Sequence, residues 1–278
     1  MKRKVNRIDR LLFAFPLLLL FSSVNAQKLP AIQTKSVRAP ANVKVDGKAF
    51  EWGDQLQAYN KSTNIFYTIA NDDEKLYLII RATDKRIIGK IINGGVTLTI
   101  NGTGKMKDIG GSSITFPAYQ KEDPMFYFGL REALELGEKN NSQIDSFMNS
   151  RNTVLSSNLK IIGISGISEV KDSIVSVYNE EEIRATGKLD RELTYIGEMA
   201  IPLKYLQVEG KQAGKFVYNI KLNGTTATGT NVQTHFAGRD IIMYTGRDGI
   251  RYYLGSSTPE NIAIALPTDF WGEYILVR

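Results

Sequence analysis

Hydrophobic and polar residues alternate with a period of two along much of this chain. Residues 65–70 and 76–82 both show the alternation, and the polar run 71–75 separates them. Strict alternation places apolar side chains on one face of an extended strand, so two such segments around a polar turn predict a β-hairpin. Residues 96–100 and 216–222 repeat the pattern, which predicts two more strands with one apolar face each.

Shorter apolar runs between turn signals predict the remaining strands. They fall at residues 159–164, 174–178, 183–189, 193–201 and 271–277, with a further hairpin over 241–254. Asn-Gly and Asp-Gly pairs recur between these segments, and both pairs tolerate the positive φ of tight turns. About ten short strands at close spacing predict an all-β fold, a single antiparallel β-sandwich of jelly-roll or immunoglobulin-like type.

Signals for helices are few, which predicts short helical insertions rather than a helical layer. Residues 130–136 (LREALEL) have the composition of a short helix that ends at Gly137. Residues 142–145 (SQID) have the spacing of a capping box, so a short helix is expected after them. In residues 201–203 (IPL), a strand is expected to stop at the proline, which opens a helical turn through Leu206.

The first 26 residues have the pattern of an export signal. A basic start is followed by the apolar run 11–21 and by small residues before Gln27. The run is shorter than the roughly 20 residues of a membrane span, so we predict a cleaved signal peptide at residues 1–26, with an uncleaved anchor as the alternative. Residues 27–42 contain two prolines and no clear period, which indicates an extended lead-in, and residues 43–278 form the predicted sandwich domain.

Composition and charge remove several kinds of chemistry. The chain has 278 residues, no cysteine and one histidine, His235, so it builds no disulfide, thiol nucleophile or three-histidine metal site. Its net charge of +6 belongs mainly to the leader, which holds five of the 35 basic and one of the 29 acidic residues. The remaining residues, 27–278, contain 30 basic and 28 acidic residues, a net charge of +2, which gives no argument for binding nucleic acid. Export without disulfides favours a bacterial envelope, so we expect a periplasmic, cell-surface or secreted protein with no membrane span in the mature chain.

Three segments, taken in order, resemble a known family. They are residues 45–52 (VDGKAFEW), residues 66–84, which form an alternating hairpin with an acidic turn, and residues 198–203 (EMAIPL) followed by 216–224. In this order and spacing they resemble the family 9 carbohydrate-binding modules and their DOMON-like relatives. Residues 268–271 (TDFW) are similar to the final strand of that family, so the resemblance covers about Val43 to Arg278.

The resemblance implies a sandwich that binds sugars, often as an accessory to enzymes that degrade polysaccharides, and it implies no catalysis. Some relatives use calcium to hold loops. Family members clamp a sugar ring between two tryptophans, whereas this chain has only Trp52 and Trp271, and neither matches a clamp position. The resemblance therefore supports the fold more directly than the ligand.

Sugar binding needs flat aromatic faces together with planar polar side chains. Residues 116–130 and 233–253 have this mixture, and we expect both stretches to rim one end of the sandwich. The candidate ligand-binding residues are Tyr119, Tyr127, Gln233, His235, Arg239, Tyr244 and Tyr252. The alternatives are that Phe126 and Phe128 alternate on a buried strand and that His235 is a hydrogen-bonded loop residue.

Candidates for metal binding and catalysis are weaker. Asp72, Asp73 and Glu74 would offer oxygen ligands to calcium, or they are solvated residues of the turn. The chain has no HExxH sequence, no glycine-rich phosphate loop and no nucleophile elbow, so we predict no catalytic residues and no cofactor other than calcium.

The leading hypothesis is non-catalytic binding of an oligosaccharide or polysaccharide by an exported bacterial protein. One alternative is an envelope module that contacts a protein partner through an exposed apolar patch. The other alternative is a glycoside hydrolase, which requires two close carboxyl groups in a cleft, at least one of them with a raised pKa.

Overall fold

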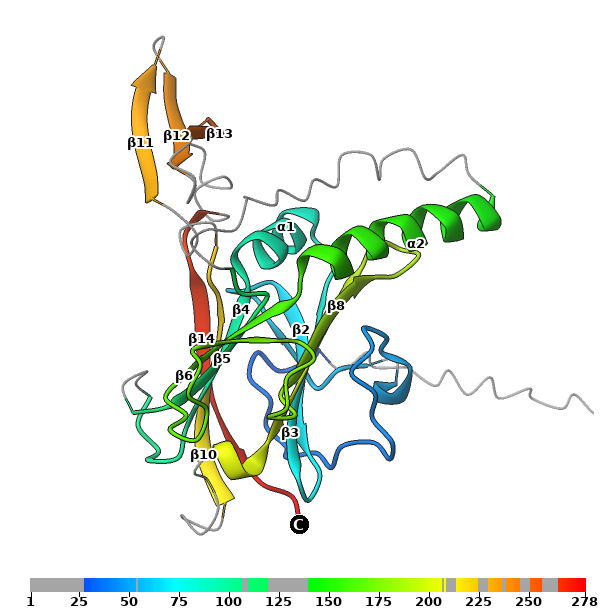
Figure 1. The fold of residues 1–278 in the computed structure, drawn as a ribbon, viewed down its shortest axis with the longest axis vertical. Coiled ribbons are helices and arrows are strands. Elements are labelled where there is room, and N and C mark those ends of the chain that lie inside the picture. Colours follow the sequence, from blue (N-terminus) through cyan, green and yellow to red (C-terminus); the bar gives the residue numbers. More distant parts are fainter. Residues whose placement is uncertain are drawn as a thin grey trace, which may run out of the picture.

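A computed structural model shows two antiparallel β-sheets packed face to face, the all-β sandwich that the sequence predicts (Figure 1). The strand order is β1-β2-β3-β9-β8 in the five-stranded sheet and β14-β10-β4-β5-β6-β7 in the six-stranded sheet. The structure describes residues 28–53, 55–106, 110–119, 140–206, 208, 214–224, 230–236, 239–245, 251–256 and 265–278.

The strands are short, and each sheet draws them from distant parts of the chain. The five-stranded sheet consists of β1 (Ala58–Asn60), β2 (Ile65–Asn71), β3 (Lys75–Ala82), β8 (Arg184–Leu189) and β9 (Tyr195–Pro202). The six-stranded sheet consists of β4 (Val96–Asn101), β5 (Ser112–Phe116), β6 (Ile161–Ser165), β7 (Ile174–Ser176), β10 (Lys215–Leu222) and β14 (Thr268–Ile275).

A third sheet is inserted between β10 and β14. Its antiparallel strands are β11 (Thr230–Phe236), β12 (Arg239–Thr245) and β13 (Arg251–Ser256), in the order β11-β12-β13. In Figure 1 this three-stranded sheet stands beyond one end of the sandwich, on the side of β14. The sequence predicted strands over 241–254, but it did not predict that they form a sheet outside the two main layers.

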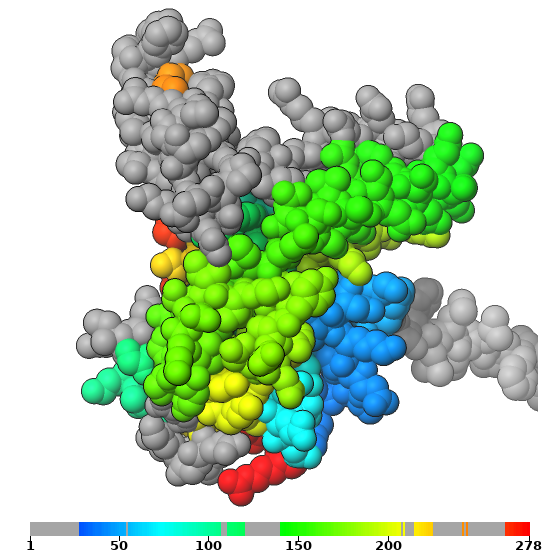
Figure 2. Space-filling view, in the orientation of Figure 1, coloured from blue at the N-terminus to red at the C-terminus, as the bar shows by residue number. Residues whose placement is uncertain are grey.

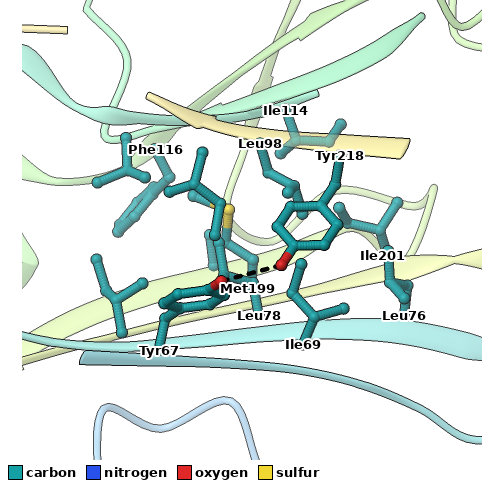
Figure 3. Packing of buried hydrophobic residues seen from close by; sticks show 14 of the residues in the cluster. Tyr67, Ile69, Leu76, Leu78, Leu98, Ile114, Phe116, Met199, Ile201 and Tyr218 are labelled. Carbon is teal, nitrogen blue, oxygen red and sulfur yellow. Dashed lines mark hydrogen bonds between the residues drawn. The ribbon is translucent and has the colours of Figure 1, made fainter. Parts of the chain in front are cut away.

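The core lies between the two sheets and follows from the alternation. Leu76 and Leu78 on β3 face inward with Ile220 on β10, and all three are at most 1% exposed. Among them, Tyr67 on β2 and Tyr218 on β10 bring their hydroxyl oxygens within 3.0 Å of each other across the interface (Figure 3). Burial raises the pKa of both phenols, so both stay protonated and hydrogen-bonded in the folded protein.

The described residues form two α-helices, of which the sequence predicted the second but not the first. Helix α1 (Lys85–Gly94) follows β3 and buries Ile88, Ile91 and Ile92 against the core, while the Asp84 side chain caps it by accepting a hydrogen bond from the Arg86 N–H (2.8 Å). This helix was not predicted, because its last two residues were interpreted as an Asn-Gly turn.

Helix α2 (Asn141–Asn158) is longer than the short helix that the sequence indicated, and its capping box begins at Asn140 rather than at Ser142. The predicted helix over 130–136 and the signal peptide over 1–26 lie outside the described residues. The helical turn after Pro202 is present as a 3₁₀ turn at Leu203–Tyr205. Neither α-helix among the described residues combines the length and apolarity needed to cross a membrane.

The N-terminal segment covers the outer face of the five-stranded sheet, as the blue atoms in Figure 2 show against the flank of the sandwich. Ala39, Val43 and Val45 pack with Ala70, Tyr77 and Ala200 of the sheet. Residues Phe50–Trp52 form a 3₁₀ turn in this segment. The outer face of this sheet is therefore a second, smaller hydrophobic core.

Candidate functional site

Glu198 on β9 is a buried carboxylate, with 2% of its surface exposed. Its Oε2 accepts hydrogen bonds from the backbone N–H groups of Asp46 (3.0 Å) and Gly47 (2.7 Å), and its Oε1 accepts one from the Trp52 indole (3.0 Å). Burial raises the pKa of this carboxyl group, and the three hydrogen bonds act in the opposite direction. The Glu198 side chain thus joins strand β9 to the segment of residues 45–52.

The contacts of Glu198 indicate a structural role. Both of its carboxylate oxygens accept hydrogen bonds from the segment that covers the sheet, and the side chain is almost fully buried. Trp52 adds an edge-to-face contact with Tyr77, with ring centroids 6.1 Å apart. The raised pKa of Glu198 therefore follows from its burial beneath the covering segment, and it does not by itself point to acid–base chemistry.

The acidic tip of the β2–β3 hairpin is held by its own hydrogen bonds. Asp72 accepts from the N–H groups of Glu74 (2.8 Å) and Lys75 (2.6 Å) and from the Tyr77 hydroxyl (2.7 Å), which together hold its pKa below the usual value although burial opposes this. Asp73 pairs with Arg38 at 2.6 Å, and that contact lowers the pKa of Asp73. No group of three side chains suited to a metal ion occurs among the described residues, and calcium binding stays a prediction.

The candidate ligand-binding residues fall in three places. Tyr119 follows β5, is half-buried, and donates a hydrogen bond to the Ile92 carbonyl of α1, so it packs against the main core. Tyr127 lies outside the described residues. The other five residues all lie on the three-stranded sheet.

The backbone register of that sheet brings four of the five together. Tyr244 on β12 pairs with Tyr252 on β13, and Gln233 and His235 pair with Ile242 and Asp240, which share the alternation of Tyr244. Successive residues of a strand alternate between faces, so Gln233, His235, Tyr244 and Tyr252 occupy positions on one face. Arg239, which pairs with Phe236, occupies a position on the opposite face.

The two tryptophans lie on opposite outer faces of the sandwich. Trp52 packs against the outer face of the five-stranded sheet. Trp271 is half-exposed on β14, where it alternates with the inward-facing Phe270 and pairs with Asn219 on β10. The sandwich stands between the two indoles, so they do not clamp one sugar ring between them.

A gap the size of about one water molecule lies between the sheets. It is lined mainly by apolar side chains, including Leu78, Ile80 and Phe116, and it borders Tyr195. Such a gap is too small for a sugar ring.

No protein-family model matches the chain, and a search of curated proteins found none that matches it. The family resemblance therefore depends only on the sequence segments 45–52, 66–84, 198–203, 216–224 and 268–271. In the structure, Glu198 of the segment 198–203 accepts hydrogen bonds from three residues of the segment 45–52. The class that the fold defines is an all-β sandwich with an inserted three-stranded sheet.

Proposed function

We propose that this chain is an exported bacterial β-sandwich protein that binds an oligosaccharide or polysaccharide without covalent chemistry. The observation that carries the proposal is the register of the three-stranded sheet, which gathers Gln233, His235, Tyr244 and Tyr252 on one face. The leader at residues 1–26 supports the proposal of export.

The chemistry of these four residues suits a sugar. Two tyrosines in adjacent strands offer neighbouring aromatic faces for the apolar C–H side of a pyranose ring. An amide and an imidazole on β11 offer donors and acceptors for the ring hydroxyls. Their positions on one face of the sheet bring aromatic and polar residue types together, which is the combination that a sugar requires.

The contacts of the acidic residues favour binding over hydrolysis. Hydrolysis of a glycosidic bond needs two carboxyl groups placed across the bond, about 5 Å or about 6.5–9.5 Å apart. Glu198, the most buried carboxylate among the described residues, holds a segment of the chain, and Asp72 and Asp84 hold a turn and a helix end. We therefore propose a binding protein, and we propose calcium only as a stabiliser of loops.

A glycan array tests the proposal on the mature chain, residues 27–278. We expect saturable binding to at least one plant, algal or host glycan, and no release of reducing sugar from it. Tyr252→Ala is expected to weaken binding by about tenfold, because it removes one of the two aromatic residues paired on that face, while Tyr178→Ala, an exposed tyrosine away from that sheet, leaves it unchanged. Silence of the native chain across the whole array, with and without added calcium, would contradict the proposal.

A further inference from the structure

We propose that the edge of strand β8 binds one ordered water molecule, which joins the Tyr195 hydroxyl to the backbone of Ala185 and Gly187. Strand β8 is the last strand of the five-stranded sheet, so only one side of its backbone pairs with another strand, β9. The inference is independent of the proposed function, because the proposed glycan site lies on the three-stranded sheet.

The backbone groups on the open side of β8 follow from its pairing with β9. Asp190, just after the strand, donates its N–H to the Thr194 carbonyl (2.9 Å), so the even-numbered residues of β8 bond to β9. Backbone hydrogen bonds of an antiparallel strand alternate in direction, so the odd-numbered residues present their N–H and C=O groups to the open side. These residues are Ile183, Ala185, Gly187 and Leu189.

Side-chain amides bond to both ends of this row. Leu189 donates its N–H to Asn152 Oδ1 and accepts from Asn152 Nδ2, both at 2.8 Å. At the other end, Ile183 donates to Asn179 Oδ1 (3.1 Å) and accepts from Asn179 Nδ2 (2.6 Å). The two asparagines therefore take the place of a neighbouring strand at the two ends of the row, and they leave its middle open.

The middle of the row is buried. Ala185 is 6% exposed, and Gly187 is also a buried residue. Within the described part of the chain, no group forms a hydrogen bond with the outward N–H and C=O groups of these two residues. Buried backbone groups are almost always paired with protein or with ordered water, so water is the partner that remains.

The Tyr195 hydroxyl is a third buried polar group at the same place. The residue is 1% exposed, and its hydroxyl has no hydrogen-bond partner among the described residues. Burial raises the pKa of the phenol, so the hydroxyl keeps its proton and can both donate and accept. It lies directly against Gly187, since a methyl group on that glycine would be 2.0 Å from the hydroxyl oxygen.

The space and the number of partners both suit a single water molecule. The gap between the sheets, which has the size of about one water, is bordered by Tyr195 and by Thr186, the residue between Ala185 and Gly187. Buried waters typically make about three hydrogen bonds. The Ala185 carbonyl accepts, the Gly187 N–H donates, and the Tyr195 hydroxyl does either, so the three groups meet this requirement. Amide, water and amide would then close the whole edge of β8 to other strands.

A high-resolution crystal structure of the mature chain, residues 27–278, tests the site directly. We expect one peak of electron density about 2.5–3.2 Å from each of three atoms, the Ala185 carbonyl oxygen, the Gly187 nitrogen and the Tyr195 hydroxyl oxygen. Absence of this peak from a map that shows other buried waters would overturn the inference.

Tyr195→Phe gives a second measurement, because it removes the hydroxyl and keeps the ring. If the hydroxyl bonds to the water, its loss leaves the water and the backbone groups short of a partner, and we expect the unfolding equilibrium constant to rise about tenfold in urea titration. The matched control is Tyr178→Phe, the same change at a residue that is 84% exposed, which should leave the constant unchanged.

The direction of the effect decides whether the hydroxyl has a partner. A hydroxyl that is buried without one destabilises the protein, so its removal would leave the unfolding constant equal to the native value or lower it. That result would overturn the inference even if the crystal contains a water beside the backbone. Density at the site together with easier unfolding of Tyr195→Phe supports it. Neither measurement involves a glycan, so the outcome leaves the proposed function untouched.

Discussion

Buried polar side chains at single positions join parts of this protein that the sheets alone would not connect. Glu198 holds the N-terminal segment through three donors. Asn71, which is 1% exposed, bonds to the Tyr274 hydroxyl (3.1 Å) and to the Val277 N–H (2.9 Å), and so ties the β2–β3 hairpin to the C-terminal end. Each of these groups is satisfied in place, so removing one would leave its partners buried without a hydrogen bond.

Glu198→Gln tests the role of the buried carboxylate. The substitution keeps the shape but places an amide NH₂ against donors, either the two backbone N–H groups or the indole. We expect a loss of about 1–3 kcal/mol in the free energy of unfolding, measured with urea. Trp52→Phe removes one of the three donors and is expected to cost about 1 kcal/mol. Wild-type stability in Glu198→Gln would mean that the segment is held by apolar packing alone.

Lys90 on α1 makes the stability depend on pH. It is fully buried, donates to Thr268 Oγ1 (2.9 Å), and has a pKa that burial lowers to about 8. The unfolded chain keeps the ordinary lysine pKa of about 10.4, so between these values it binds more protons than the folded protein, and stability rises with pH.

The measurement is urea unfolding at about pH 7 and about pH 9.5, below the range in which the buried tyrosines contribute. We expect the native chain to gain stability over this interval and Lys90→Met to show less of the gain. An identical pH dependence in both proteins would show that Lys90 is not desolvated in the folded state.

For single residues, the sequence predicted local backbone conformation but not contacts with distant residues. Asp46-Gly47 was correctly interpreted as a turn, since Gly47 has a φ of 77°. Its partner, Glu198, could not be identified, because a carboxylate that accepts hydrogen bonds from distant residues looks in sequence like any acidic residue in a strand.

Side-chain amides form hydrogen bonds with backbone groups at the edges of strands β2 and β8. Gln33 accepts from the Ile69 N–H and donates to the Ile69 carbonyl, both at 2.8 Å, and so continues the pairing of β2 beyond the short β1. Asn152 of α2 makes the same two-point contact with Leu189 at the end of β8, again at 2.8 Å. Both contacts satisfy strand edges that would otherwise offer pairing sites to other chains.

Two paired glycines make room for a tyrosine in the five-stranded sheet. Gly187 on β8 lies opposite Gly197 on β9, and the ring of Tyr195 packs over both. A methyl group added at Gly187 would lie 2.0 Å from the Tyr195 hydroxyl oxygen. Since that oxygen is buried in a packed core, the ring cannot move aside freely.

Gly187→Ala is therefore expected to lower the free energy of unfolding by about 3 kcal/mol, measured by urea titration. Gly89→Ala is the matched control, because a methyl group there meets nothing within 4 Å on helix α1 and should add about 1 kcal/mol through helix propensity. If both variants shift stability in the same direction, the packing of Tyr195 over the glycines is not as described.

The elements that the sequence predicted are those with clear periods. The alternation over 65–82 formed the β2–β3 hairpin, whereas β5 (SSITF) and β11 (TNVQTHF) were missed because polar residues dilute their pattern. The sequence of helix α1 does contain a helical pattern, because Asp84 can cap a helix and the isoleucines after it have helical spacing. The Asn-Gly pair at the end of the helix was instead interpreted as a turn, so the helix was not predicted.

At the scale of the whole molecule, the sandwich was predictable and the placement of its surfaces was not. Period-two segments without a helical layer allow few arrangements besides two stacked sheets. Nothing in the sequence shows that Trp52 and Trp271 lie on opposite sides, or that the insertion between β10 and β14 forms its own sheet. Those facts depend on which strands are neighbours, and strand order is a property of the folded chain.

The central claim is that this protein binds a glycan on the aromatic residues of its three-stranded sheet without cleaving it. Calorimetric titration of the mature chain with a polysaccharide chosen from the array, beside a reducing-sugar assay on the same mixture, tests it most directly. The account predicts saturable heat for the native chain, a reduced affinity when Tyr244 and Tyr252 are both changed to alanine, and no new reducing ends. Sugar release, or full affinity in the double variant, would contradict it.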